Sequence, residues 1–66
     1  METFAERLKV LREEKGLSMD GLAKALKVSS SSVHRWEHQS DIKASQLIIL
    51  AKFFGVSTDY LLGLEN

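Results

Sequence analysis

The middle of the chain contains two short predicted helices that follow each other almost without a break. Ser18 can cap a helix at about Met19–Leu26, and Ser29 can cap another at about Ser30–His38. The break at Lys27–Val28 is too short for the two helices to lie flat and antiparallel with good packing. It favours a steep crossing, the helix-turn-helix geometry, in which the N-terminal half of the second helix projects outward.

The rest of the chain is also predicted to be helical, because no segment alternates apolar and polar residues for long enough to indicate a strand. A first helix is expected at about Thr3–Lys15, where Thr3 and Glu6 have the spacing of a capping box. Two more are expected at about Ala44–Phe54 and Thr58–Leu62. Since 66 residues support only one domain, we predict an all-α, five-helix helix-turn-helix domain that spans the whole chain.

Catalytic and metal-dependent functions find little support in the residues present. The chain has no cysteine, which excludes disulfides, thiolate metal ligands and cysteine nucleophiles. Residues 34–38 match a zinc peptidase pattern, His-Arg-Trp-Glu-His, but a catalytic zinc needs a third protein ligand and the chain has no other histidine. No set of nucleophile, base and orienting group can be assembled. We therefore expect no enzyme activity, no cofactor and no metal site.

No segment has the character of a targeting or membrane sequence. The first residues are charged and have no apolar run behind them, so they do not read as a signal peptide. No stretch approaches the roughly 18 apolar residues of a membrane span. We expect a cytoplasmic protein with no membrane partner.

The charge of the chain is balanced, with nine Lys and Arg residues against nine Asp and Glu residues. Within residues 1–15, four acidic and four basic side chains are expected to form a solvated helix face. Residues 16–52 carry two more basic than acidic side chains, and residues 53–66 carry two more acidic than basic ones. This distribution suits DNA but is weak, so few phosphates can be neutralised by one monomer and a dimer is needed to double the contacts.

The helix predicted after Ser29 has one face made of hydrogen-bonding side chains. A helix turns by about 100° per residue, which gathers these side chains within an arc of about 140°. The members of this polar arc are Ser30, Ser31, His34, Arg35 and His38. Such side chains can contact base edges or phosphates, and DNA contact is favoured for the arginine over the alternative of a solvated surface group. The serines could equally be simple helix caps. Trp36 lies off the arc and is expected to anchor the core rather than to stack on a ligand.

With these features in place, the sequence resembles the XRE family, the Cro- and phage-repressor-type helix-turn-helix proteins. The resemblance extends from Phe4 to Gly63. It rests on residues that follow the order and spacing of the family, namely Leu17-Ser18, Leu22-Ala23, Leu26, Val28-Ser29, Val33, Arg35-Trp36-Glu37, Leu47, Leu50-Ala51-Lys52, Gly55-Val56-Ser57 and Asp59-Tyr60-Leu61-Leu62-Gly63. It implies a compact lambda-repressor-like domain whose third helix reads double-stranded DNA, usually as a homodimer on a palindromic operator.

The resemblance also implies roles for individual residues. Its DNA-binding positions correspond to Ser18, Met19, Ser29, Ser30, Ser31, His34, Arg35, His38 and Lys43. A structural ion pair between the first and third helices is implied for Arg12 and Glu37. The chain departs from the family at Met19, where Gln is common, at Gly21, where Glu is common, and at Lys27, where Gly is frequent.

Two functions of different classes follow from these observations. The first is a sequence-specific DNA-binding transcriptional regulator, expected to be a dimeric repressor. The second is a protein-interaction module on the same fold, such as an antirepressor or an antitoxin-like partner of a regulatory protein. The tail carries more apolar surface than a terminal helix needs, so Tyr60, Leu62 and Leu64 are candidate dimer contacts, with core closure as the alternative for Tyr60.

Overall fold

Side chains at the predicted cap positions, Thr3, Ser18, Ser29 and Ser57, bond the first turns of four helices of this protein. Thr3 and Glu6 form the expected capping box: Thr3 Oγ1 accepts from the Glu6 amide at 3.2 Å, and the Thr3 amide donates to Glu6 Oε1 at 3.1 Å. This bond from the Thr3 amide lowers the pKa of Glu6. Ser18 accepts from the Gly21 amide at 2.9 Å and Ser57 from the Tyr60 amide at 2.9 Å. Each hydroxyl satisfies an amide that the helix itself leaves unpaired.

The computed structural model describes residues 3–65, which form five helices and no strand. They are α1 (Phe4–Glu14), α2 (Met19–Leu26), α3 (Ser30–Gln39), α4 (Ala44–Phe54) and α5 (Thr58–Leu61). The all-α, five-helix prediction is therefore confirmed for this range, and every bound lies within one residue of its expected position. No helix in residues 3–65 has the length and apolar character that a bilayer crossing requires.

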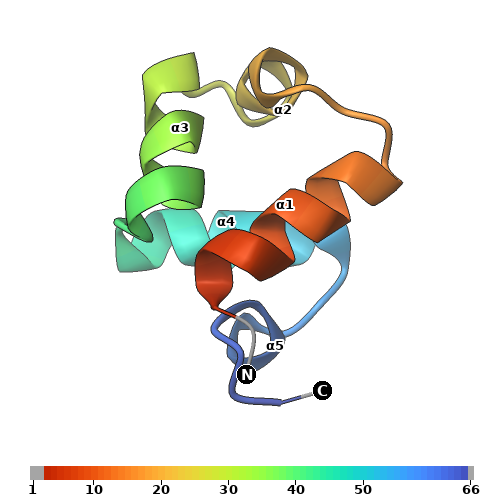
Figure 1. The fold of residues 1–66 in the computed structure, drawn as a ribbon, viewed down its shortest axis with the longest axis vertical. Helices are drawn as coiled ribbons and strands as arrows, with labels where there is room; N and C mark the ends of the chain where they lie inside the picture. Colours follow the sequence, from red (N-terminus) through yellow and green to blue (C-terminus); the bar gives the residue numbers. More distant parts are fainter. Residues whose placement is uncertain (1–2, 66) are drawn as a thin grey trace.

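α2 and the start of α3 lie together at one end of the molecule. α5 lies at the opposite end, and α1 crosses in front of α4 between them (Figure 1). α3 packs against both α1 and α2 and begins beside α2. The first turn of α3 is thus presented at the same end as α2, as a helix-turn-helix arrangement requires.

Every helix contributes at least one fully buried apolar side chain to a single core. These side chains are Leu8 of α1, Leu22 of α2, Val33 and Trp36 of α3, Leu50 of α4 and Leu61 of α5. Trp36 is only 2% exposed, which confirms it as a core anchor. Because α3 buries Val33 and Trp36, the polar arc predicted on its other side must face outward.

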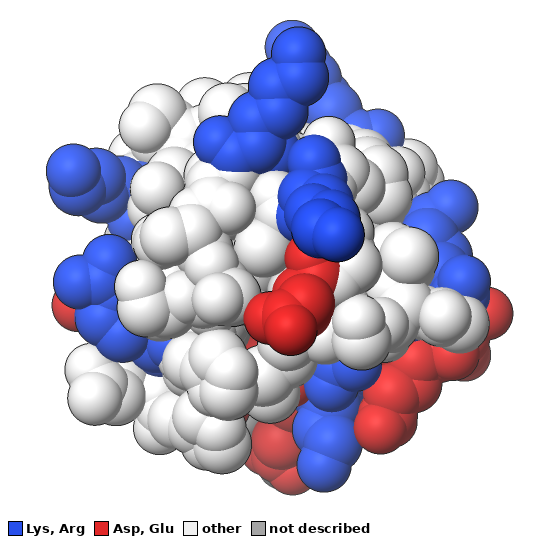
Figure 2. Space-filling view, turned by 90° about the horizontal axis from the view of Figure 1, so that it is seen from above, with Lys and Arg blue, Asp and Glu red and all other residues white. Residues whose placement is uncertain are grey.

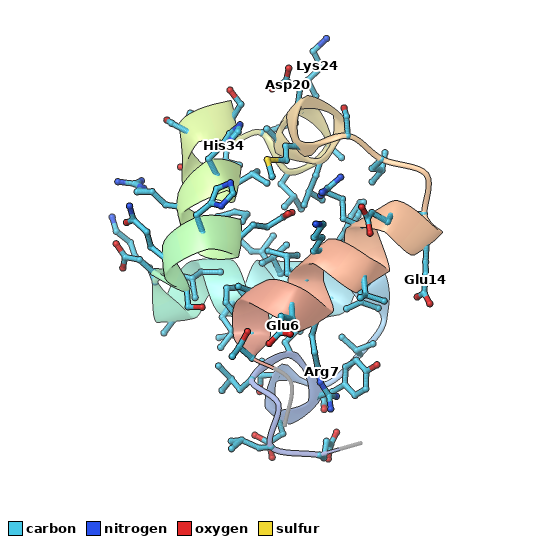
Figure 3. All side chains as sticks on the ribbon, in the orientation of Figure 1. Glu6, Arg7, Glu14, Asp20, Lys24 and His34 are labelled. Atoms are coloured by element: carbon cyan, nitrogen blue, oxygen red, sulfur yellow. The ribbon has the colours of Figure 1, made fainter. Side chains whose placement is uncertain are left out.

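One expectation for α1 is wrong, since its charged side chains do not all form a solvated face. Arg7 is buried: its Nη1 donates to the backbone oxygens of Tyr60, at 3.2 Å, and of Glu65, at 2.7 Å. Its guanidinium also lies 4.3 Å from the centre of the Tyr60 ring. Figure 3 shows Arg7 directed toward α5 and the segment after it. Arg7 therefore holds the C-terminal segment against α1. Its charged group is buried, although the charge pattern of the helix predicted that it would be exposed to solvent.

The turn between α2 and α3 is closed by Lys27 in a left-handed conformation, with φ 60° and ψ 43°. Its amide donates to the carbonyls of Ala23 and Lys24, which ends α2. A residue with a Cβ pays about 1–2 kcal/mol for this conformation, whereas glycine adopts it freely. The steep crossing of the two helices thus depends on a strained residue.

Replacing Lys27 with glycine should stabilise the protein by about 1 kcal/mol. This is the net effect, because relief of the left-handed conformation outweighs the larger conformational entropy that glycine loses on folding. The measurement is the free energy of unfolding in urea. Lys24→Gly is the matched control, because the same change inside α2 should cost about 1 kcal/mol. A loss of stability in Lys27→Gly would show that the left-handed turn carries no strain.

Candidate nucleic-acid interface

The polar arc of α3 is open to solvent along its whole length. Ser30, Ser31, His34, Arg35 and His38 are all exposed, while Val33 and Trp36 on the other side of the helix are buried. The His34 and His38 rings stack one turn apart, with centroids 5.8 Å apart and planes inclined by 23°. The arc thus offers hydroxyl, imidazole and guanidinium groups on one surface, a set that can hydrogen-bond base edges and phosphates.

An ion pair on the inner side of α3 fixes the orientation of this arc. Arg12 Nε donates to Glu37 Oε2 at 2.6 Å and Arg12 Nη2 donates to Glu37 Oε1 at 3.1 Å. Arg12 Nη1 also donates to the Leu17 carbonyl at 2.7 Å, so the same side chain holds the loop before α2. The bond to Glu37 raises the pKa of Arg12. Both side chains are almost fully buried, which makes this contact a clamp between α1 and α3 rather than a surface pair.

The other positions carried over from the family lie in different surroundings. The Ser18 and Ser29 hydroxyls are both engaged in capping, and Ser29 Oγ lies 3.1 Å from Ser31 Oγ. The Met19 side chain is half-buried and packs on the core, so no extended polar side chain stands at this position. Lys43 is exposed but precedes α4, beyond the C-terminal end of α3, and is separated from the serines by the length of α3.

The end of the molecule formed by α2 and the start of α3 has an uneven charge distribution. Figure 2 views this end and shows Lys and Arg mostly at its rim, a broad uncharged area, and one acidic side chain beside a basic one near its middle. Figure 3 places Asp20 and Lys24 at this end, on α2. Asp20 was not among the residues predicted for this surface. Its signal was the four-residue spacing to Lys24, which puts both side chains on one side of α2.

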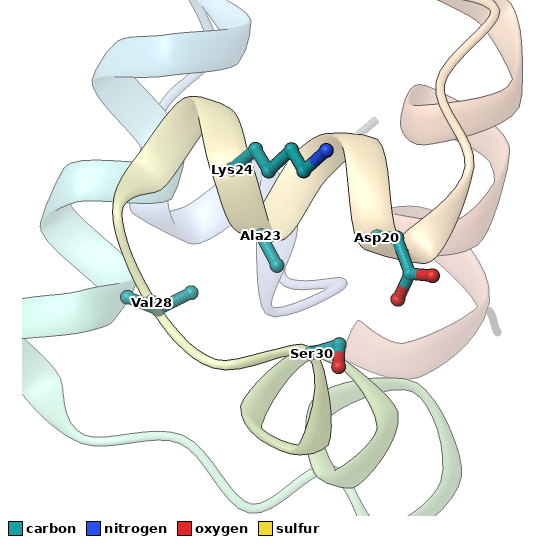
Figure 4. A pocket seen from close by; sticks show the side chains of 5 residues that line it. All are labelled: Asp20, Ala23, Lys24, Val28 and Ser30. Atoms are coloured by element: carbon teal, nitrogen blue, oxygen red, sulfur yellow. The ribbon is translucent and has the colours of Figure 1, made fainter.

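A shallow open cleft of about 300 Å³ separates α2 from the first turn of α3. It is lined by Asp20, Ala23, Lys24, Val28 and Ser30. Figure 4 shows the Asp20 carboxylate, the Lys24 side chain and the Ser30 side chain around this cleft. Ser30 is also a member of the polar arc, so the cleft joins the arc to α2.

The tail residues expected at a dimer contact divide into two kinds. The Tyr60 ring is half-buried beneath the Arg7 guanidinium, while the neighbouring Leu61 is fully buried in the core. Leu62 and Leu64 are 41% and 66% exposed, and Ile48 and Ile49 of α4 are about equally exposed at 49% and 50%. Ile48 and Ile49 were not among the predicted dimer contacts. Within residues 3–65, no three metal-ligating side chains converge on a common point.

Comparison with known proteins agrees with this arrangement. A helix-turn-helix family model matches residues 8–61, which include α2, α3 and the turn between them. The chain is also 37% identical, over 64 residues, to the uncharacterized HTH-type transcriptional regulator YobD of Bacillus subtilis strain 168. That similarity covers 96% of this chain and 57% of YobD, so the chain spans little more than half the length of this relative. On the family match and the helical fold, the chain belongs to the XRE family of helix-turn-helix proteins.

Proposed function

We propose that this protein is a sequence-specific DNA-binding transcriptional regulator, and that it acts as a dimeric repressor on a palindromic operator. The observation that carries the proposal is the exposed polar arc of α3, held outward by the buried Trp36 and by the Arg12–Glu37 clamp. A major groove is wide enough to admit one helix, and the side chains of the arc are donors and acceptors suited to base edges and phosphates. The family match and the regulator name of YobD support the same function.

In this proposal the first turn of α3 enters the major groove and α2 lies against the backbone. Ser30, Ser31 and His34 are nearest to the groove, and Arg35 reaches a guanine edge or a phosphate. Two copies place their α3 helices in successive major grooves, about 34 Å apart. We propose Leu62 and Leu64 as dimer contacts because burying these exposed side chains removes apolar surface from water.

The experiment that tests this function is selection of bound sequences from a random duplex pool at low salt. A palindromic consensus with half-sites about one helical turn apart is the expected result. Sedimentation of the purified complex should then show two protein chains on each duplex. Recovery of sequences with no common motif would contradict the proposal, and one chain on each duplex would contradict the dimer.

A second candidate function is a protein-interaction module that uses the same surface. The zero net charge favours it, as does the Met19 side chain, which packs inward where the family commonly has a polar Gln. Chromatography of the protein on immobilised random-sequence DNA at low salt distinguishes the two functions. A regulator is retained and elutes with a clear dependence on salt, whereas an interaction module passes through.

DNA affinity should also rise as the pH falls from about 7.5 to about 6. Histidine is the side chain whose charge changes close to neutral pH, and added positive charge beside phosphates favours binding. Since His34 and His38 are the only histidines, the variant His34→Gln/His38→Gln removes this response completely. Fluorescence anisotropy with a labelled operator at both pH values provides the measurement. Equal wild-type affinities at the two pH values would refute the role of the histidines.

A further inference from the structure

Asp20 lies in the part of the surface that DNA would approach in the proposed complex. It is exposed, it is the second residue of α2, and it lines the cleft whose opposite wall is formed by Ser30 of the polar arc. Figure 2 shows that the middle of this end of the molecule holds an acidic side chain, and Figure 3 shows Asp20 there. A carboxylate therefore stands beside the positions proposed to contact DNA.

The Asp20 carboxylate is not held in an ion pair by the part of the chain that the structure describes, in contrast to Glu37, which Arg12 neutralises. Lys24 lies one turn further along α2 on the same cleft (Figure 4). In the proposed complex its positive charge would attract phosphates, and the negative charge of Asp20 would oppose that attraction. Residues 16–52 carry only two more basic than acidic side chains, so one carboxylate on this surface offsets a large part of the attraction.

We propose that Asp20 is an affinity-limiting residue that weakens binding to the DNA backbone. The inference rests on the proposed function. Phosphate contacts supply essentially all of the affinity for non-cognate DNA, so a carboxylate close to phosphates lowers that affinity whatever the base sequence. The uncharged side chains of the arc are then left to distinguish the operator by hydrogen bonds. Asp20 thereby keeps a protein of zero net charge from accumulating on random DNA.

The test compares Asp20→Asn with Asp59→Asn. Both residues occupy the second position of a helix, α2 and α5 respectively, and both are exposed. The two changes remove the same charge and the same favourable interaction with a helix N-terminus, so their effects on stability should match. α5 lies at the end of the molecule opposite to α2 (Figure 1), so salt screens its charges from DNA bound at the α2 end.

Binding is measured with a labelled random-sequence duplex and with the operator obtained by selection, at about 50 and 200 mM salt. Asp20→Asn should bind both duplexes about threefold to tenfold more tightly than wild type at the lower salt, and the gain should shrink at the higher salt. Asp59→Asn should bind like wild type, and Lys24→Gln should bind more weakly.

The possible results separate this inference from the function on which it rests. If wild type binds the operator and Asp20→Asn does no better than Asp59→Asn, the affinity-limiting role is overturned while the regulator stands. If neither wild type nor the variants bind any duplex at low salt, the proposed function fails and the role of Asp20 fails with it. Thermal unfolding of both asparagine variants checks that the comparison is between equally folded proteins.

Discussion

Replacing Arg35 with alanine should weaken operator binding roughly fivefold to 150-fold, the equivalent of about 1–3 kcal/mol for a single base or phosphate contact. Arg35 is the arginine of the exposed arc, and Trp36 next to it is buried, so the backbone that carries Arg35 is held firmly in place. Its guanidinium can bind a guanine edge or a phosphate through two parallel bonds. The measurement is a titration of wild type and variant with the selected operator.

The same titration distinguishes the kinds of contact that Arg35 could make. A base contact predicts relaxed preference at one operator position, while a phosphate contact predicts uniform weakening and a salt slope reduced by about one. Arg35→Lys keeps the charge and loses the two-pronged geometry, so it should restore a phosphate contact better than a base contact. Lys9→Ala, an exposed change on α1, serves as the control. Equal affinities for Arg35→Ala and Lys9→Ala would show that Arg35 is a solvated surface residue.

Replacing Glu37 with glutamine should destabilise the fold by about 3 kcal/mol, because it leaves the Arg12 guanidinium buried without its carboxylate. The Arg12 and Glu37 side chains are only 9% and 2% exposed, so water cannot replace the lost partner. A domain of this size is expected to have a total stability of roughly 3–10 kcal/mol. A large part of the folded population could therefore be lost through one change that barely alters side-chain volume.

Urea unfolding followed by tryptophan fluorescence measures this effect, since Trp36 is the only tryptophan and is buried beside Glu37 in α3. Glu14→Gln is the control, because Glu14 is exposed at the end of α1 and should contribute less than about 1 kcal/mol. A cost below about 1 kcal/mol for Glu37→Gln would contradict the role of the Arg12–Glu37 pair as a clamp on α3. The variant should also bind operator more weakly than wild type, because the polar arc is no longer held in a fixed direction by the ion pair.

The structural features that could be predicted from the sequence are those that depend on residues close together in the chain. Thr3, Ser18, Ser29 and Ser57 mark helix starts because a cap hydroxyl bonds an amide three residues away, a contact that no distant segment needs to complete. The composition of the polar arc and its separation from Trp36 follow in the same way from the constant turn of a helix. The pairing of Arg12 with Glu37 was anticipated only through the family resemblance, since 25 residues separate the two.

Other features depend on which distant segments meet when the chain folds. Arg7 was predicted to be solvated because its helix is rich in charged residues. Its partners are carbonyls 53 and 58 residues away, and no local sequence pattern can predict such contacts. Asp20 and Ser30 face one cleft only because α2 and α3 cross steeply, and Met19 turns inward because the core lies beneath it. Local hydrogen bonds and helix geometry act over about four residues, whereas burial of a charge or exposure of a surface is a property of the assembled fold.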